Sequence, residues 1–458
     1  MNVAIDRVTV AKFDVPGPRY TSYPTAPVWS EDVNEKVYRD KLQAFGKTEK
    51  TLSLYIHIPF CRSLCSYCGC NVVVRKADER FGDEYLKCLS KEMELVRRFI
   101  GGRKKVAQFH VGGGTPTFLS EAQIERLYVK AQENFDIDPE GEIAIEIDPR
   151  TTTESKIKKL RALGFNRVSI GVQDFNEDVQ RQVGRHQPYS LVKELHERCR
   201  ELQFESVNFD LIYGLPRQTV KSFRETVEKV ILLRPDRIAL YSFAYVPWLK
   251  RHQRKIEASL LPSSDLKLDI FLNARAQFLE GGYMAIAMDH FALEDDELAR
   301  AFKRGTLYRN FMGYTVKPAD EYIGLGLTSI GFLEGTYVQN QKALPAYERR
   351  LKSGHLPVER GKILSPDDKK RQWTIRSLMC QFQVDKKVFA GLFGVDFDQY
   401  FKEEKTHIRK CVQDGLIRCE GDKIYATDLG KIFIRNVCMG FDYYLKGKGS
   451  QQKFSRTI

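Results

Sequence analysis

The sequence predicts an α/β protein built on an open or partial barrel of six strand and helix units. From residue 50, β-rich apolar segments alternate with helical patterns, the order expected of parallel strands joined by crossover helices. Polar or glycine residues also follow successive strands, and the active site of such folds gathers at the carboxyl ends of the strands. A second, mainly helical unit begins near residue 360.

Each candidate strand is a short run rich in Val, Ile, Phe and Tyr. The six runs cover residues 52–58, 106–111, 142–147, 167–172, 206–212 and 237–243. Helical patterns lie between them, for example at 121–135 and 222–233. One polar residue at a strand end means little, but a series at equivalent places favours a shared site. The series consists of His57, Gly112–Gly114, Glu146, Gln173 and Asp210. His57 is equally compatible with a core histidine, so we leave it outside the site.

The alternation fades after residue 250. The segments 281–292, 309–315 and 322–332 are rich in Gly and aromatic residues, and we expect them to form core and turns. After helical patterns that reach residue 413, two short β-like runs flank EGDK at 420–423 and predict a hairpin. Helices, a hairpin and a last helix resemble a winged-helix topology, an analogy of fold that does not by itself mean DNA binding.

Composition and charge narrow the class of protein. The 458 residues, 42% of them hydrophobic, suffice for two or more domains. Charged residues interrupt the first twenty-five positions, and no apolar run is long enough to span a bilayer, so we expect a cytoplasmic protein. The net charge of +13 favours an anionic partner, although a solvated basic surface explains it equally well. A reducing compartment favours metal ligation or catalysis over disulfides for clustered cysteines.

Four cysteines stand within ten residues, in the stretch CRSLCSYCGC at 61–70. Structural zinc sites usually need a second pair of ligands further along the chain, which we do not find, and a redox CxxC does not need the extra cysteines. Thiolates at close spacing hold iron–sulfur clusters. Three ligands on one loop would hold a four-iron cluster and leave one iron open. The three candidate ligands are Cys61, Cys65 and Cys68.

The spacing CxxxCxxC after the first strand of an α/β barrel resembles the radical S-adenosylmethionine (SAM) enzymes. In that superfamily the open iron binds the amino and carboxyl groups of SAM. The run GGGTPT at 112–117 looks like the glycine motif that binds the methionine part of SAM. Glycines let the backbone approach a ligand, and exposed N–H groups can bind a carboxylate. The resemblance implies a partial (β/α)6 TIM-like barrel of the radical SAM type.

A narrower resemblance spans nearly the whole chain. The stretches PGPRYTSYPTA (16–26), YIHIPFCRSLCSYCGCN (55–71), IEIDPR (145–150), RVSIGVQDFN (167–176), NFDLIYGLP (208–216), MDHFA (288–292) and QQKFSRTI (451–458) resemble the oxygen-independent coproporphyrinogen III oxidases, or dehydrogenases. The related haem chaperone-like proteins have Phe in place of Cys70 and lack the PRYTSYPT segment. Both features favour the enzymes.

The resemblance implies one [4Fe-4S] cluster on Cys61, Cys65 and Cys68 and two SAM molecules. For the first SAM the matching positions are Tyr55, Gly113, Glu146 and Ile330. For the second they are Tyr67, Gly114, Thr115, Gln173, Arg185, Asp210 and Ala244. Carboxylates can hold an ammonium group or ribose hydroxyls, and an arginine can bind a carboxylate with two donors. Tyr67 stands where some members have Phe, and core packing explains Ala244 and Ile330 equally well.

The implied reaction is the anaerobic oxidative decarboxylation of two propionates of coproporphyrinogen III to vinyl groups, giving protoporphyrinogen IX in haem biosynthesis. The implied enzyme is a cytoplasmic monomer that uses an electron donor and an electron acceptor not identified by the sequence, with no nucleic-acid partner and no membrane span. Two alternatives stay open. A haem-binding or trafficking relative would bind tetrapyrrole without converting it, and a winged-helix nucleic-acid binder would explain the charge but not the cysteines.

Cys70 is the remaining cysteine of the loop. A fourth thiolate is geometrically conceivable there, because side chains two apart on an extended chain can point the same way. It would close the open iron, so we predict that Cys70 is not a ligand but a catalytic residue near the adenosyl groups or the substrate. A buried packing thiol is the alternative.

We divide the chain into four parts on these patterns. They are an N-terminal arm (1–48), a radical SAM barrel core (49–250), a barrel extension and connecting region (251–358) and a mainly helical C-terminal domain (359–458). We expect the last part to cover the mouth of the barrel and to help hold the substrate.

Overall fold

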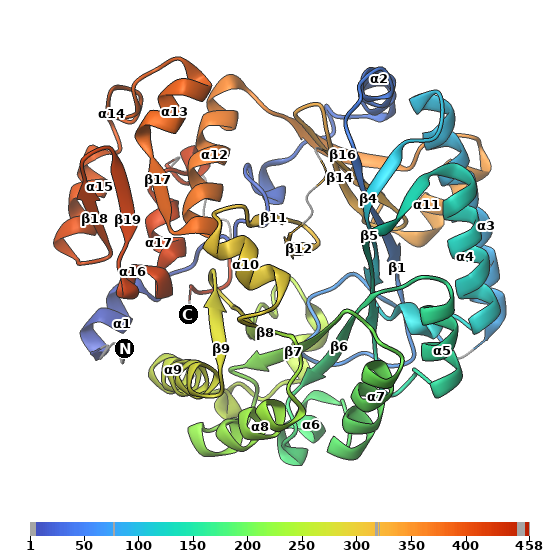
Figure 1. The fold of residues 1–458 in the computed structure, drawn as a ribbon, viewed down its shortest axis with the longest axis horizontal. Helices are drawn as coiled ribbons and strands as arrows, with labels where there is room; N and C mark the ends of the chain where they lie inside the picture. Colours follow the sequence, from blue (N-terminus) through green and yellow to red (C-terminus); the bar gives the residue numbers. More distant parts are fainter. Residues whose placement is uncertain (1–5, 77, 317–318, 320, 447–453, 458) are drawn as a thin grey trace.

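A computed structural model describes residues 6–76, 78–316, 319, 321–446 and 454–457. Six neighbouring parallel strands form the centre of a twelve-stranded sheet and curve into a partial barrel (Figure 1). All six strands lie where the sequence predicts them, and the predicted fold class is confirmed. They are β1 (Leu52–Ile58), β4 (Lys105–Gly113), β5 (Asp136–Ile147), β6 (Arg167–Gln173), β7 (Ser206–Tyr213) and β8 (Arg237–Ser242).

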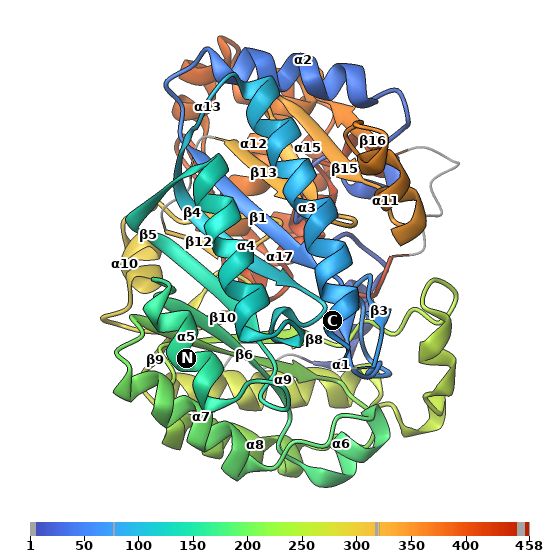
Figure 2. The same cartoon turned by 90° about the vertical axis from the view of Figure 1, so that its right-hand side faces the viewer.

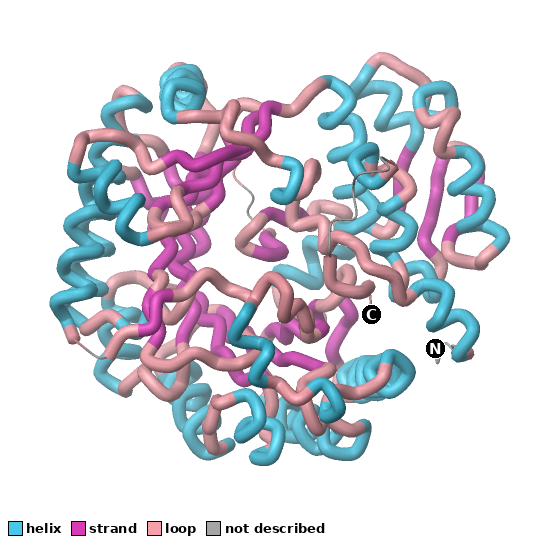
Figure 3. Tube along the Cα trace, turned by 180° about the vertical axis from the view of Figure 1, so that it is seen from behind, coloured by secondary structure: helices cyan, strands magenta, loops and turns pink. Residues whose placement is uncertain are grey.

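Helices cover the outside of the barrel strands (Figures 2 and 3). Their ends are set by local chemistry. Asp78 accepts a hydrogen bond from the backbone N–H of Arg80 at the start of α3, and Gly101 ends that helix in the left-handed conformation. Ser120 and Gln123 form a capping box at the start of α4. The helices are α3 (Glu79–Ile100), α4 (Glu121–Asn134), α5 (Glu154–Ala162), α6 (Glu177–Val183), α7 (Tyr189–Glu201), α8 (Val220–Leu233) and α9 (Ser264–Glu280).

The barrel strands are apolar along much of their length because both faces of the sheet are covered. In β1 every residue but Tyr55 is buried. A parallel strand with helices on one face and the barrel interior on the other has no solvent face, so its apolar run is nearly continuous. Polar residues interrupt this pattern at both ends of the strands, with Arg167 and Arg237 at amino ends and Gln173 at a carboxyl end.

The segments 281–292, 309–315 and 322–332 contribute to the core, as expected, but they form strands as well as turns. Short runs with many glycines carry little periodicity, and only the neighbouring strands show their role. On one edge, β10 (His290–Leu293) and β9 (Tyr283–Ile286) extend the sheet in antiparallel fashion. On the other edge lie β13 (Glu321–Leu325), parallel to β1, and then antiparallel β14 (Ile330–Leu333), β15 (Thr336–Asn340) and β16 (Val358–Ile363).

Smaller elements complete this region. The strands β11 (Tyr308–Asn310) and β12 (Gly313–Thr315) form a separate hairpin. Two further short strands, β2 (Phe60–Cys61) and β3 (Val73–Val74), pair in parallel at the base of the cysteine loop. The helices are α10 (Glu297–Lys303) and α11 (Leu344–Lys352), and the turns of 3-10 helix are η1 (Ala26–Val28), η2 (Pro116–Phe118), η3 (Arg251–Lys255), η4 (Ala258–Leu260) and η5 (Tyr443–Leu445).

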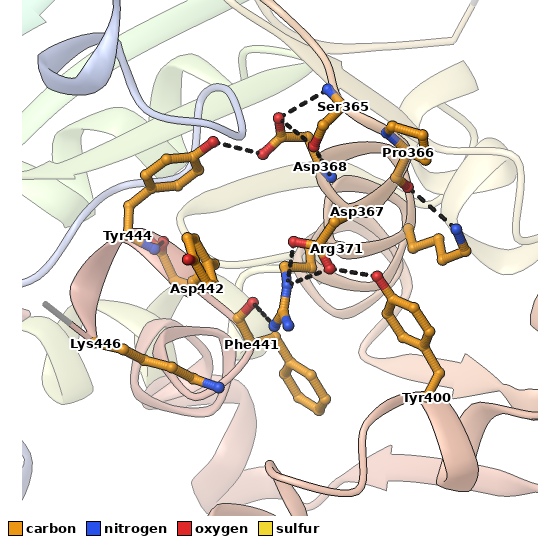
Figure 4. A network of polar contacts seen from close by, with 12 residues as sticks. Ser365, Pro366, Asp367, Asp368, Arg371, Tyr400, Phe441, Asp442, Tyr444 and Lys446 are labelled. Atoms are coloured by element: carbon orange, nitrogen blue, oxygen red, sulfur yellow. Dashed lines mark hydrogen bonds and ion pairs between the residues drawn. The ribbon is translucent and has the colours of Figure 1, made fainter.

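The C-terminal unit has the predicted winged-helix-like arrangement. The hairpin expected around EGDK is β18–β19, in a small sheet with the order β17-β19-β18. A polar network joins the start of its first helix to the chain after residue 440 (Figure 4). Its elements are α12 (Pro366–Gln381), β17 (Gln383–Asp385), α13 (Lys386–Phe393), α14 (Phe397–Tyr400), α15 (Lys405–Gln413), β18 (Ile417–Glu420), β19 (Lys423–Ala426), α16 (Asp428–Ile432) and α17 (Ile434–Met439).

The N-terminal arm joins the C-terminal unit to the far edge of the large sheet. Its helices are α1 (Arg7–Phe13) and α2 (Glu35–Gly46). Buried Arg435 of α17 donates a 2.9 Å hydrogen bond to the carbonyl of Pro18, and an antiparallel bridge joins Ser30 to Gly361. Half of the last predicted stretch, namely 451–453 and 458, lies outside the described residues. In the described part, no helix is both long enough and apolar enough to cross a bilayer.

Candidate active site

An open cavity of about 950 Å³ lies at the carboxyl ends of the barrel strands. This is the place where the fold class puts an active site, because the loops after parallel strands meet there. Each of the strands β4 to β8 contributes a residue of its carboxyl-terminal half to the cavity lining. These residues are Gly113, Glu146, Gln173, Asp210 and Tyr241.

The cysteine loop forms one wall of this cavity, and all four of its cysteines line it. The segment after β8 holds the loop in place. Lys250 Nζ donates to the carbonyl oxygen of Cys70 at 3.1 Å, and His252 Nε2 lies 2.8 Å from the carbonyl oxygen of Cys68. Cys61 Sγ lies 3.3 Å from the hydroxyl of Thr115. The loop is therefore fixed against both the glycine run and a segment nearly two hundred residues away in sequence.

Cations lie close to part of the loop: Lys250 and Arg185 favour the thiolate form of Cys68, the form that a metal needs. A hydrogen bond with Cys70 lowers the pKa of Cys68 to about 7, and the same hydrogen bond, together with burial, raises the pKa of Cys70. Burial raises the pKa of Cys61 to about 11. Arg150 Nη2 lies 3.8 Å from Cys65 Sγ.

The three predicted ligands fit a cluster better than a single ion. In the described parts of the chain, no three His, Cys, Asp or Glu side chains converge on a point that could hold one ion. A four-iron cluster takes one thiolate for each iron, so its ligands stand further apart around a shared void. Cys61, Cys65 and Cys68 line one cavity and influence one another electrostatically, which is the donor arrangement that such a cluster needs.

The glycine run passes close behind this wall. Gly113 has a φ of +121°, and a Cβ atom there would lie 2.7 Å from the ring of His57. Its N–H donates at 3.0 Å to Glu146 Oε2, and the N–H of Gly114 donates at 2.8 Å to the carbonyl of Ile58. The expectation that these N–H groups are exposed to a ligand carboxylate was wrong, because protein acceptors already occupy them.

Glu146 is held in the ionised form by its neighbours. Burial raises its pKa, but hydrogen bonds from His110 and Gly113 outweigh burial and lower the pKa below its ordinary value. His110 Nε2 lies 3.3 Å from Glu146 Oε1. The ring of Tyr55 stacks on His110 with centroids 5.8 Å apart, and its hydroxyl lies 3.0 Å from Nδ1 of His57. A stack of polar rings thus supports one carboxylate that faces the cavity.

Arg185 forms a second charged group in the wall. It is 7% exposed, its Nη1 donates to Asp148 Oδ2 at 2.9 Å, and its Nη2 donates to the carbonyl of Gly171 at 2.6 Å. Its Nε is buried and has no hydrogen-bond partner among the described residues. Burial raises the pKa of Asp148, but Arg185 and Arg150 outweigh it and lower the pKa. The pair remains charged, and both of its residues line the cavity.

Asp210 has the opposite electrostatic character from Glu146. Burial, and then the charge of Glu146, raise its pKa to about 6. Ser169 Oγ and Asn208 Nδ2 each donate to one of its carboxyl oxygens at 2.9 Å. Gln173 ends the neighbouring strand with a φ of +68°. The cavity wall therefore contains one firmly ionised carboxylate and one that can change its charge near neutral pH.

Most of the predicted cofactor-binding residues come together in this cavity. Those that line it are Tyr67, Gly113, Gly114, Thr115, Glu146, Gln173, Arg185 and Asp210. Tyr55, Ala244 and Ile330 do not line it. Tyr55 lies behind Glu146 in the ring stack described above. The carbonyl of Ala244 accepts from Gln253 Nε2 at 3.1 Å, next to the carbonyl of Tyr67, and Ile330 stands on β14 against an apolar cluster that includes Trp29.

Sequence analysis missed several residues of the wall, and strand periodicity could have found some of them. Side chains two apart on a strand share a face. Asp148 is two residues beyond Glu146, and Ser169 and Gly171 precede Gln173 at the same spacing. No comparable signal in the sequence marks Tyr241, or the residues Lys250 and His252 that contact the cysteine loop. They come from the far side of the barrel and meet the site only through the closed fold.

Comparisons with known proteins agree with this architecture. Residues 55–230 match the family model described as the radical SAM superfamily, and residues 364–433 match the HemN C-terminal domain. The chain is similar to the oxygen-independent coproporphyrinogen III oxidase of Escherichia coli (strain K12), at 43% identity over 99% of this chain and 98% of that protein. It is also 43% identical to the protein of that name from Synechocystis sp., over 96% of this chain and 95% of the relative.

A solved structure is similar over nearly the whole chain. It is described as coproporphyrinogen III oxidase (HemN) from Escherichia coli, a radical SAM enzyme. The TM-score is 0.91 at 41% sequence identity, and the match covers 97% of this chain and 100% of the other. Barrel, connecting region and C-terminal unit are thus all shared with a single known architecture.

Proposed function

Because the chain belongs to the oxygen-independent coproporphyrinogen III oxidases of the radical SAM superfamily, we propose that it converts two propionate side chains of coproporphyrinogen III to vinyl groups without oxygen. The product is protoporphyrinogen IX, in haem biosynthesis. Near-complete coverage of relatives at 43% identity supports this proposal. The observation that carries it is the meeting of three loop cysteines, a glycine run and five acidic or basic side chains in one cavity at the strand ends.

The superfamily implies a [4Fe-4S] cluster and SAM as cofactors. Cys61, Cys65 and Cys68 would hold the cluster, and neighbouring cations would favour their thiolates. When bound, the cluster and SAM supply a 5'-deoxyadenosyl radical that takes a hydrogen atom from a propionate β-carbon. The resulting substrate radical loses carbon dioxide and passes one electron to an acceptor, which completes the alkene. The protein's share is to position the reacting carbon and to exclude water.

A second SAM is part of the proposal. A further cavity of about 750 Å³ adjoins the first and shares Glu146, Ser169, Asp210 and Tyr241 with it. On this proposal Glu146 and Gly113, backed by Tyr55 and the strand with Ile330, contact one SAM. The other would contact the set Tyr67, Gly114, Thr115, Gln173, Arg185, Asp210 and Ala244. Arg185 has a donor available for a carboxylate, and Asp210 can accept from hydroxyl or ammonium groups.

The remaining parts of the proposal concern the setting of the enzyme. We take it to act as a monomer in the cytoplasm, with an electron donor and an electron acceptor that are separate molecules. Cys70 lines the cavity without being one of the three proposed ligands. Its place beside Cys68 fits a residue that contacts SAM or the substrate and not the cluster.

Anaerobic reconstitution tests the proposal. Purified protein is loaded with iron and sulfide, reduced, and incubated with SAM and coproporphyrinogen III. We expect one four-iron cluster per chain, together with protoporphyrinogen IX and 5'-deoxyadenosine. Tetrapyrrole binding without any vinyl product would instead identify a haem-trafficking relative. Tightly bound zinc as the sole metal would show that the proposed iron–sulfur cluster is wrong.

A further inference from the structure

A separate cavity of about 480 Å³ lies on the C-terminal side of the barrel mouth. Its walls come from the N-terminal arm, the β11–β12 hairpin, the strands β13 to β15 and helix α12. Figure 1 shows β11 and β12 between the barrel strands and α12. The cavity is therefore built by parts of the chain that the radical chemistry does not use.

Two arginines are the charged side chains of this cavity, and its lining contains no carboxylate. Arg309 comes from β11 and Arg376 from α12. Around them the walls are aromatic, from Tyr23, Tyr308, Tyr322 and Tyr337. A ligand that fits would combine an anionic group with an apolar or aromatic body.

Neither arginine forms an ion pair among the described residues, although buried Asp289 acts electrostatically on Arg309. Arg309 donates through Nη1 to the carbonyls of Arg19 at 2.8 Å and Tyr20 at 3.4 Å, and lies 5.1 Å from the centre of the Tyr314 ring. In the described part of the chain, Arg376 makes one hydrogen bond, from Nη1 to the hydroxyl of Tyr308 at 3.4 Å, and lies 5.0 Å from the centre of that ring. Both guanidinium groups line the cavity without a carboxylate in hydrogen-bond contact.

Most other arginines of low exposure have a carboxylate partner, although Arg435 is bound by backbone carbonyls among the described residues. Arg185, Arg237 and Arg371 each form an ion pair with a carboxylate at 2.8–2.9 Å. Holding two partly buried cations together without an anion costs free energy, and proteins usually avoid this by pairing. An arrangement that keeps two unpaired arginines beside one void points to an anion that comes from outside the chain.

The arginine cavity lies close to the proposed active site. Tyr241 lines the radical cavity, and its ring lies 5.8 Å from that of His290, which in turn lies 4.9 Å from the ring of Tyr314. Arg309 lies 5.1 Å from the centre of that last ring, so a short series of ring contacts connects the wall of the radical cavity to Arg309. The arginine cavity is distinct from the cysteine loop and shares no lining residue with it.

We propose that Arg309 and Arg376 bind carboxylate arms of the substrate that do not react, while the arm that reacts enters the radical cavity. This inference rests on the proposed function and names the substrate-anchoring subsite of that reaction. Of the four propionates of coproporphyrinogen III, two keep their carboxylates throughout, so they can remain bound while the others are processed. The tyrosines of the cavity pack against the pyrrole ring that bears the anchored arm.

The test uses the reconstituted full-length protein and coproporphyrin III, a fluorescent tetracarboxylate that is not turned over. Arg376→Gln and Arg309→Gln should each weaken its binding, and raise KM for coproporphyrinogen III, by about tenfold, the loss of one charge-assisted hydrogen bond. The tetramethyl ester of coproporphyrin III should bind the wild type and the variants equally weakly. Cleavage of SAM without substrate should not change, because neither residue lies in that cavity.

Arg418→Gln is the matched control. Arg418 also lies 5.0 Å from a tyrosine ring centre, that of Tyr425, but it is exposed and pairs with Glu420. Wild-type affinity in the Arg309→Gln/Arg376→Gln double variant, or an ester that binds as tightly as the acid, would overturn the inference. If Arg309→Gln fails to fold, Arg376→Gln decides alone, since that side chain makes a single long hydrogen bond.

The same experiments separate this inference from the proposed function. If the wild type binds coproporphyrin III through the two arginines but yields no vinyl product, the subsite is supported and the proposed function is wrong. If the wild type has full turnover but the double variant has unchanged affinity and KM, the proposed function is supported and the subsite is wrong.

Discussion

Arg185 and Arg371 are both buried arginines that form ion pairs, but their surroundings differ. Arg185 pairs with Asp148 at the wall of the radical cavity and keeps its buried Nε without a partner among the described residues. Arg371 lies in the C-terminal network, where it donates at 2.8 Å to Asp367 and Glu404 and at 3.0 Å to the carbonyl of Phe441 (Figure 4). None of the cavities described above reaches it.

The comparison separates two uses of a buried charge. In the C-terminal network, Glu404 also accepts from Lys446 at 2.6 Å, and Asp367 accepts from Tyr400, so the charges are compensated within the protein. At the radical cavity, part of the hydrogen-bonding capacity is left for another molecule. Burial and pairing by themselves do not mark a functional arginine. An unused donor beside a void does so more directly.

The cavity region is tested most severely by Cys65→Ser. A serine oxygen is a poor substitute for a thiolate ligand, so the variant should lose the cluster and with it all measurable turnover. Iron and sulfide analysis and the visible absorption of the anaerobically reconstituted protein measure the loss. A variant that keeps full iron content would remove Cys65 from the ligand set.

The two arginines themselves allow a crossed experiment. Arg371→Gln should lower the free energy of unfolding by about 3–5 kcal/mol, because it leaves Glu404 with fewer buried partners, while turnover per folded molecule stays near wild type. Arg185→Gln should lower turnover by about a hundredfold, because a ligand contact is lost as well as an ion pair. Chemical denaturation and anaerobic product assays give the two readouts. If both variants changed stability and turnover to the same extent, the distinction between the two arginines would be wrong.

Cys70→Ser distinguishes residues that line the cavity from those that hold the cluster. We expect full iron content and unchanged cluster absorption, with turnover reduced by about tenfold or more. Cys65→Ser, prepared in parallel, is the reference for cluster loss. Loss of the cluster in Cys70→Ser would make Cys70 a ligand after all, and unchanged turnover would leave it a packing role alone.

The last prediction concerns the pH dependence of stability that arises from two carboxyl groups, one in each region. Burial raises the pKa of both Asp210 and Asp442 to about 6. A carboxyl whose pKa is higher in the folded than in the unfolded chain binds more protons when folded. Stability from that group is therefore full below about pH 4 and is lost as the pH rises through about 6.

Asp210→Asn removes this dependence. Relative to the wild type, the free energy of unfolding of this variant should rise by about 3 kcal/mol in total, most of it between pH 4 and 6, with little further gain above that range. Asp442→Asn should behave alike without ligand. Added SAM should shift the titration of Asp210 and leave that of Asp442 unchanged, as followed by denaturation at each pH. A response of Asp442 to SAM would contradict the assignment of that network to the scaffold.

Local patterns were sufficient for much of this protein. The six barrel strands, the hairpin β18–β19 and the cysteine loop are each encoded within a few residues, by alternating apolar runs, turn residues or ligand spacing. Chain geometry alone keeps Cys61, Cys65 and Cys68 close together, because only seven residue steps separate the first from the last. The resemblance of such segments to a family also placed most of the residues that line the radical cavity.

The closed fold decided the rest. Sequence does not show that Arg185 pairs with Asp148, that His252 contacts the cysteine loop, or that Arg309 and Arg376 face one void from β11 and α12. Nor did it show that 321–325 joins the barrel beside β1, or that Gly113 gives its N–H to Glu146. These contacts join residues far apart in the chain. They depend on how whole strands and helices pack, because no covalent constraint brings such residues together before the chain folds.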